Sequence, residues 1–154
     1  MKQYRFDDIA ALQGIVSEDF GQWGAELEVT QEMINQFAAL SGDDYWLHTD
    51  PEKCSQMSPF KVPIAHGFLT LILLPRLRAA QEWEIVGFNN MMNYGSNKLR
   101  FTGIVPVGSR IHARSRVKEV TQSPKGLTVV MEQQVNVVGQ DRPALIYELI
   151  FMYM

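Results

Sequence analysis

An apolar run from Phe68 to Leu74 limits the possible folds of this chain more than any other segment. Thr70 is its only polar residue, and Gly67 precedes it. The run predicts a helix that is apolar all round, and such a helix must be buried on all sides. In a chain of 154 residues the natural cover is a curved sheet. Because Pro75 has no backbone N–H to donate, we expect the helix to kink or tighten there.

Short helices are predicted ahead of this run. Phe6–Gly14 has apolar residues at helical spacing and a glycine that can end a helix. Thr30 suits the N-cap of a second helix that ends near Gly42. Asp50 and Pro51 suit the cap and the first position of a third. The buried face of the second helix should carry Met33, Phe37 and Leu40.

The remaining segments favour β-strands. Trp23–Val29 alternates apolar and polar residues, and Trp83–Tyr94 is an irregular second candidate. The later predicted strands are Asn97–Phe101, Arg110–Lys118, Leu127–Val138 and Ala144–Met154. The last of these is apolar at nearly every position, which indicates cover by the core on one face and by a partner subunit on the other. Helices followed by antiparallel strands predict the α+β class.

Composition excludes several classes of protein. With 46% hydrophobic and 20% charged residues the chain is of the soluble globular type. A formal charge of -3 argues against nucleic acid or an anionic membrane as the main partner. One cysteine permits no internal disulfide, and the first residues lack the apolar segment of a secretory signal. We therefore expect one cytoplasmic domain spanning residues 1–154.

Asp43 and His48 are candidate catalytic residues in the polar stretch before the apolar run. They lie five positions apart in a loop that follows a predicted helix. A carboxylate and an imidazole that reach one water molecule can activate it. The alternative is local structure, with Asp43 in a turn and His48 hydrogen-bonded in the core. Spacing alone favours the local interpretation.

His66 and Gly67 open the apolar helix. The first amides of a helix lack internal partners and carry partial positive charge, and glycine lets a ligand approach them. This arrangement can hold a carbonyl oxygen as it gains charge. The alternative is that Gly67 only permits close packing.

Other chemistries find less support. Asp43, His48, Cys54 and His66 are metal-ligand types, but their spacing matches no zinc motif, so no metal is predicted. The chain has no G-x-S-x-G, P-loop or dinucleotide-binding glycine motif. Cys54 is interpreted as a small buried hydrophobe. The basic stripe Arg110–Lys118 should face solvent or, alternatively, contact phosphates.

Three separated motifs resemble those of a known family. Ser41-Gly42-Asp43 followed by Leu47-His48 is similar to the SGD-x-N-P-L-H signature of MaoC-like (R)-specific enoyl-CoA hydratases. PIAHGFLTLILLP resembles the entry into the central helix of that family. NYGSNKLRF and VPVGSRI resemble the subgroup that includes the nodulation protein NodN. Tyr45-Trp46 depart from the usual Asn-Pro, which leaves substrate choice open.

The resemblance implies a hot-dog fold, in which a curved antiparallel sheet wraps a long central helix and two subunits pair. The family's catalytic aspartate and histidine fall on Asp43 and His48, which would activate the water that adds to a trans-2-enoyl thioester. The helix amide that polarises the thioester carbonyl falls on Gly67. Further substrate contacts are expected at His66, Asn97, Lys98 and Arg100, the last two or the basic stripe meeting coenzyme A phosphates.

The predicted function is therefore that of an enoyl-CoA hydratase acting reversibly as a 3-hydroxyacyl-CoA dehydratase. It needs no metal or redox cofactor, since coenzyme A arrives as part of the substrate. One alternative is a hot-dog thioesterase, although His66–Ala80 contains no acidic residue to serve it. Another is a non-catalytic acyl-thioester binding protein, against which the Asp43 and His48 pair counts. A homodimer is expected in each case.

Overall fold

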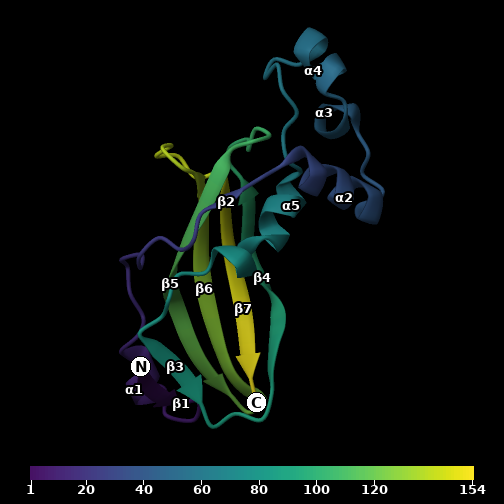
Figure 1. Cartoon of the computed structure of the whole chain (residues 1–154). Helices are drawn as coiled ribbons and strands as arrows, with labels where there is room; N and C mark the ends of the chain where they lie inside the picture. The colour runs from purple at the N-terminus through teal and green to yellow at the C-terminus, as the bar shows by residue number, and fades with distance from the viewer.

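A five-stranded antiparallel sheet curls around one helical segment in the computed structural model, which describes residues 1–154 (Figure 1). The strand order is β2–β5–β6–β7–β4, so β2 and β4 form the edges. This arrangement confirms the α+β class and the late run of strands. The strands are β2 (Leu27–Glu28), β4 (Met91–Phe101), β5 (Arg110–Ser123), β6 (Gly126–Val137) and β7 (Leu145–Tyr153).

The central segment consists of α5 (Gly67–Ile72) and the 3-10 helix η1 (Leu74–Leu77). It crosses the concave face of the sheet (Figure 1), and its buried side joins the main core. Pro75 lies in η1, so the expected tightening is confirmed. The prediction of a long helix buried on all sides is wrong for the single chain. The α-helix has six residues, and Phe68 and Ile72 on its outer face are 58% and 55% exposed.

A second core lies at the far end of the sheet. β1 (Lys2–Arg5) and β3 (Trp83–Val86) form a parallel ribbon, and α1 (Ile9–Gln13) packs beside it. Neither β1 nor its pairing was predicted. The single strand expected over Trp83–Tyr94 is divided into β3 and the start of β4 by a turn at Gly87.

The strand expected over Trp23–Val29 shortens to β2, two residues long. The segment before it follows the free edge of β5 through single hydrogen bonds. Gly21 N–H donates to Ser115 O over 2.9 Å, and Gly24 N–H donates to Ala113 O over 2.8 Å.

Three helices project beyond one end of the sheet: α2 (Gln31–Ser41), α3 (Trp46–Thr49) and α4 (Pro51–Met57) (Figure 1). The predicted caps are confirmed, because Thr30 accepts from the Met33 N–H and Asp50 accepts from the Lys53 N–H. The predicted buried face of α2 is partly wrong. Ile34 and Ala38 are its buried residues, whereas Leu40 is 83% exposed.

The basic stripe of β5 is largely covered rather than solvent-facing. Phe20 lies against the guanidinium groups of Arg114 and Arg116. Arg116 pairs with Glu18 and Glu132, and its side chain is only 11% exposed. The expectation of a free basic face is therefore wrong for these two arginines, whose charges are engaged within the chain.

Candidate active site

The fold brings Asp43, His48 and His66 together. One carboxylate oxygen or ring nitrogen from each residue lies within 4.8 Å of the others. Asp43 follows the C-terminal end of α2, His48 lies in α3, and His66 is the N-cap of α5. The site therefore joins the projecting helices to the segment inside the sheet.

The main chain sets the tautomer of His48. Its Nδ1 lies 2.7 Å from Ile64 O, and a carbonyl can only accept, so Nδ1 carries the proton. In the neutral ring Nε2 then holds the lone pair and is free to accept a proton. The Gln31 side-chain amide donates to His48 O over 2.8 Å, which holds the backbone of α3 in place.

His66 connects the two catalytic candidates. Its Nε2–H donates to Asp43 O over 2.8 Å, and its ring stacks on His48 with centroids 3.9 Å apart. The side chain is only 3% exposed, and burial lowers the pKa of His66 below its ordinary value. The ring is therefore held neutral, with its Nδ1 lone pair buried and unpartnered. His66 clamps the loop that carries Asp43 to the start of α5.

Gly67 fits both explanations considered for it, an amide open to a carbonyl oxygen and a position of close packing. Its backbone N–H has no acceptor within the chain, as expected for the first amide of a helix. A Cβ built at Gly67 would lie 2.6 Å from the Phe101 ring, so any side chain here must displace that ring. A cavity of about 410 Å³ opens beside this amide, and its walls include His48, Thr70 and Phe101.

Three predicted substrate contacts lie apart from this group. Asn97, Lys98 and Arg100 are exposed on β4. Leu99 packs against the main core and Phe101 lies over Gly67. Because side chains alternate along a strand, Lys98 and Arg100 point to the opposite face. The structure does not bring them to the catalytic candidates of the same chain.

The donor set is poorly arranged for a metal ion. Asp43, His48 and His66 could each offer a ligand atom. The two imidazoles are stacked at 25°, so their in-plane lone pairs run side by side instead of converging on one point. Cys54 is fully buried, with its thiol 3.5 Å from Leu47 O, and it fits its interpretation as a small hydrophobe.

Tyr45 and Trp46, which replace the usual Asn-Pro, have defined positions. The Tyr45 ring meets His48 edge-on with centroids 6.4 Å apart. The Lys53 ammonium lies 5.0 Å above the Trp46 ring. Tyr45 thus borders the proposed base, whereas Trp46 packs away from it under a lysine.

Sequence reasoning missed three supports of the site. Ile64 O orients His48, Phe101 covers Gly67, and Gln31 holds the backbone of α3. The first two act through contacts between segments that are distant in sequence or through backbone atoms. Neither type of contact leaves a residue pattern that spacing could reveal.

Comparisons with known proteins point to the same family as the three sequence motifs. Residues 22–139 match the family model described as MaoC like domain. The chain is 40% identical over 151 residues to 3-hydroxyacyl-thioester dehydratase Z of Mycobacterium tuberculosis, covering 96% of this chain and 97% of that protein. It is 30% identical over 148 residues to nodulation protein N of Rhizobium meliloti, covering 94% and 88%.

A solved structure supports the fold. R-hydratase PhaJ1 from Pseudomonas aeruginosa superposes with a TM-score of 0.67 at 26% identity, covering 88% of this chain and 81% of that chain. The sheet and its enclosed helix are thus a hot-dog fold, and the relatives indicate an enzyme of the hydratase type. The chain belongs to the MaoC-like dehydratase family, in the subgroup with nodulation protein N. None of its helices is long and apolar enough to cross a membrane.

Proposed function

We propose that this protein catalyses the reversible hydration of trans-2-enoyl-CoA to (R)-3-hydroxyacyl-CoA. The observation that supports the proposal is that side-chain atoms of Asp43 and His48 lie within 4.8 Å of each other, a distance that one water molecule can bridge. The Gly67 N–H, which has no acceptor in the chain, adds to it. The relatives are named for dehydration of 3-hydroxyacyl thioesters and for (R)-hydration. Neither name specifies the thioester on which this chain acts.

Each group has a defined role in the proposed reaction. Asp43 and the Nε2 lone pair of His48 hold the water and take up its proton as the hydroxyl bonds to the β-carbon. A proton returned to the α-carbon completes the addition, and dehydration reverses these steps. A positioned acid–base group contributes roughly 10²–10⁴-fold to the rate.

The Gly67 amide would bind the thioester oxygen. This oxygen gains negative charge while water adds at the β-carbon. A single well-placed donor at such an oxygen contributes on the order of 10²–10³-fold. The acyl tail would then run along α5 away from the catalytic residues, and coenzyme A would lie on the side of Phe101. Asn97, Lys98 and Arg100 remain proposed contacts for coenzyme A, reached from the β4 edge.

The test is a turnover assay with crotonyl-CoA, followed by loss of the enoyl absorbance. Asp43→Ala and His48→Ala should fold normally and lose at least about two orders of magnitude in kcat. Asp44→Ala is the matched control, because its carboxylate is exposed and makes no hydrogen bond or ion pair. Wild-type turnover in either catalytic variant would rule out the mechanism. Release of free thiol without hydration would identify a thioesterase instead.

A further inference from the structure

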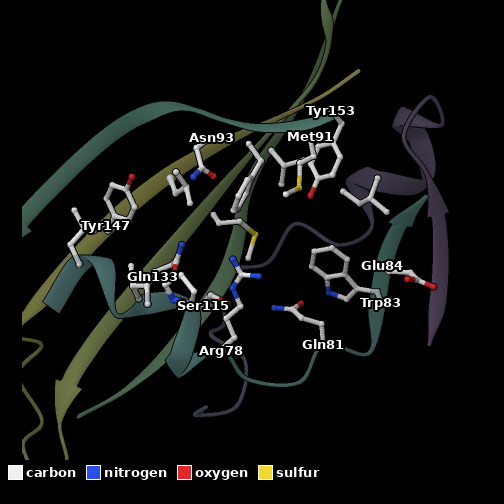
Figure 2. A pocket seen from close by; sticks show the side chains of 18 of the residues that line it. Arg78, Gln81, Trp83, Glu84, Met91, Asn93, Ser115, Gln133, Tyr147 and Tyr153 are labelled. Carbon is white, nitrogen blue, oxygen red and sulfur yellow. The ribbon is translucent and has the colours of Figure 1, made fainter. Parts of the chain in front are cut away.

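A second and larger cavity lies past the C-terminal end of α5. It has a volume of about 520 Å³ and lies between η1, β3 and the concave face of the sheet (Figure 2). This volume is typical of sites for small molecules. Its walls are mainly apolar and include Leu71, Leu74, Met131, Leu149 and Phe151.

Arg78 is the only basic residue that lines this cavity. Figure 2 shows its side chain rising into the cavity beside Gln81 and Ser115. It has no ion-pair partner in the chain. The only acidic residue in the wall, Glu84, accepts a hydrogen bond from Gln3 and points away from the cavity in Figure 2. The cavity therefore has apolar walls and one uncompensated positive charge.

A helix C-terminus alone does not explain this placement. Cations are favoured near the last carbonyls of a helix, and Arg76 in η1 already provides one there. Both arginines are exposed, but only Arg78 lines the cavity. A guanidinium matches a carboxylate with two parallel hydrogen bonds. The Tyr153 hydroxyl, whose pKa is raised by burial, stays protonated in the same cavity as a further donor.

The central segment connects this cavity to the proposed carbonyl site. At about 1.5 Å per residue in α5 and about 2.0 Å in η1, Gly67 and Arg78 lie about 19 Å apart along the segment. The arginine side chain spans part of this distance. At about 1.2 Å per bond of an extended chain, a tail of about ten carbons spans the rest.

We propose that this cavity holds the far end of the acyl tail, and that Arg78 makes the enzyme prefer tails ending in a carboxylate. The inference rests on the proposed hydratase function and specifies its substrate class. The methylenes contact the apolar walls, and the terminal carboxylate binds the guanidinium.

The test compares two trans-2-enoyl-CoA substrates of ten carbons, one ending in methyl and the other in carboxylate. The ratio of kcat/KM for the carboxylate over the methyl substrate should exceed one in the wild type. It should fall at least tenfold in Arg78→Gln and stay at the wild-type value in Arg76→Gln. A wild-type preference for the methyl tail overturns the proposal. So does an unchanged ratio in Arg78→Gln, which is the result expected if Arg78 met coenzyme A phosphates.

A binding measurement separates this inference from the hydratase proposal. Trp83 lines the cavity, so its fluorescence should report occupancy, with Trp83→Phe as the background. Decanoate should bind more tightly than decanol to the wild type, and Arg78→Gln should abolish the difference. Crotonyl-CoA turnover without this difference overturns the inference alone. The difference without crotonyl-CoA turnover overturns the hydratase proposal, and with it the assignment of the cavity to a substrate tail.

Discussion

The neutral state of His66 makes folding sensitive to acid. Burial lowers the pKa of His66, and the nearby charge of His48 acts in the same direction. The unfolded chain, with a histidine pKa of about 6.5, then binds more protons than the folded chain as the pH falls. Stability should be constant above about pH 6.5 on this account and decline below it, down to the folded pKa.

Thermal melts between pH 5 and pH 8 test this dependence. His66→Gln should flatten the decline, since glutamine cannot be protonated yet can still donate to Asp43 O. His112, stacked on Trp23, also has its pKa lowered by burial, so His112→Gln should remove a separate part of the slope. An unchanged slope in both variants would contradict the account.

Gly67 permits a test that separates packing from catalysis. Gly67→Val should reduce kcat/KM far more than thermal stability, because the valine side chain crowds the free N–H of residue 67. The contact with Phe101 gives the packing explanation a physical basis as well. In the double variant with Phe101→Ala the clash is relieved, so we expect the melting temperature to recover and the activity to stay low. Recovery of both would assign Gly67 to packing only.

At the scale of elements, Gly24 lies where the chain passes between β5 and the end of η1. A Cβ at this position would lie 1.8 Å from Leu77 O and 2.7 Å from Ala79 N, both backbone atoms. Gly24→Ala should therefore cost about 1–3 kcal/mol, the usual range for overpacking. Gly21→Ala is the control, since its Cβ meets only Ser115 O at 3.4 Å. Chemical denaturation of the two variants gives the comparison, and equal stabilities would refute it.

Short-range sequence patterns predicted where helices begin better than they predicted strand pairing or burial. The caps at Thr30 and Asp50 were predictable because a cap bonds an amide three residues away. The β1–β3 ribbon was not, since it pairs residues about eighty positions apart and Lys2–Arg5 has no apolar alternation. The exposure of Leu40 likewise depends on how α2 packs in the folded protein.

The residues of the candidate site were predictable, but the hydrogen bonds that join them were not. Residue chemistry and motif resemblance together predicted Asp43, His48, His66 and Gly67, and the fold brings them together. The hydrogen bond from His66 to Asp43 O involves a main-chain atom 23 residues away, which no side-chain pattern encodes. Arg78 was not among the predicted site residues, because its cavity exists only once the sheet has curled.

At the scale of the whole molecule, one edge of the sheet is open. β4 pairs with β7 on one side only, and most of its residues are exposed. The large apolar side chains exposed on β4 and α5 are Met91, Met92, Tyr94, Phe101, Phe68 and Ile72. The terminal strand β7 is flanked by β6 and β4, so the open edge available to a partner is that of β4.

We therefore expect a homodimer that pairs through β4 and the outer face of α5. Sedimentation at micromolar concentration should give twice the chain mass, and Ile72→Lys should shift the equilibrium towards single chains. Leu40→Lys is the control, because Leu40 is a similarly exposed apolar residue on the projecting α2. A wild-type mass of one chain would contradict the expectation.

The projecting helices enter and leave the sheet at almost the same point. Val29, before α2, exchanges hydrogen bonds with Gly108 and Ser109, and Pro63, after α4, accepts from Val107. Asp43 and His48 thus belong to a unit that leaves and rejoins the sheet at one turn. Ile34 of α2 and the hydrogen bond from His66 to Asp43 O dock this unit on the main core. Such a unit can detach with less free energy than global unfolding requires. Warming should therefore abolish catalytic activity reversibly at a temperature where the circular dichroism of the sheet is still unchanged.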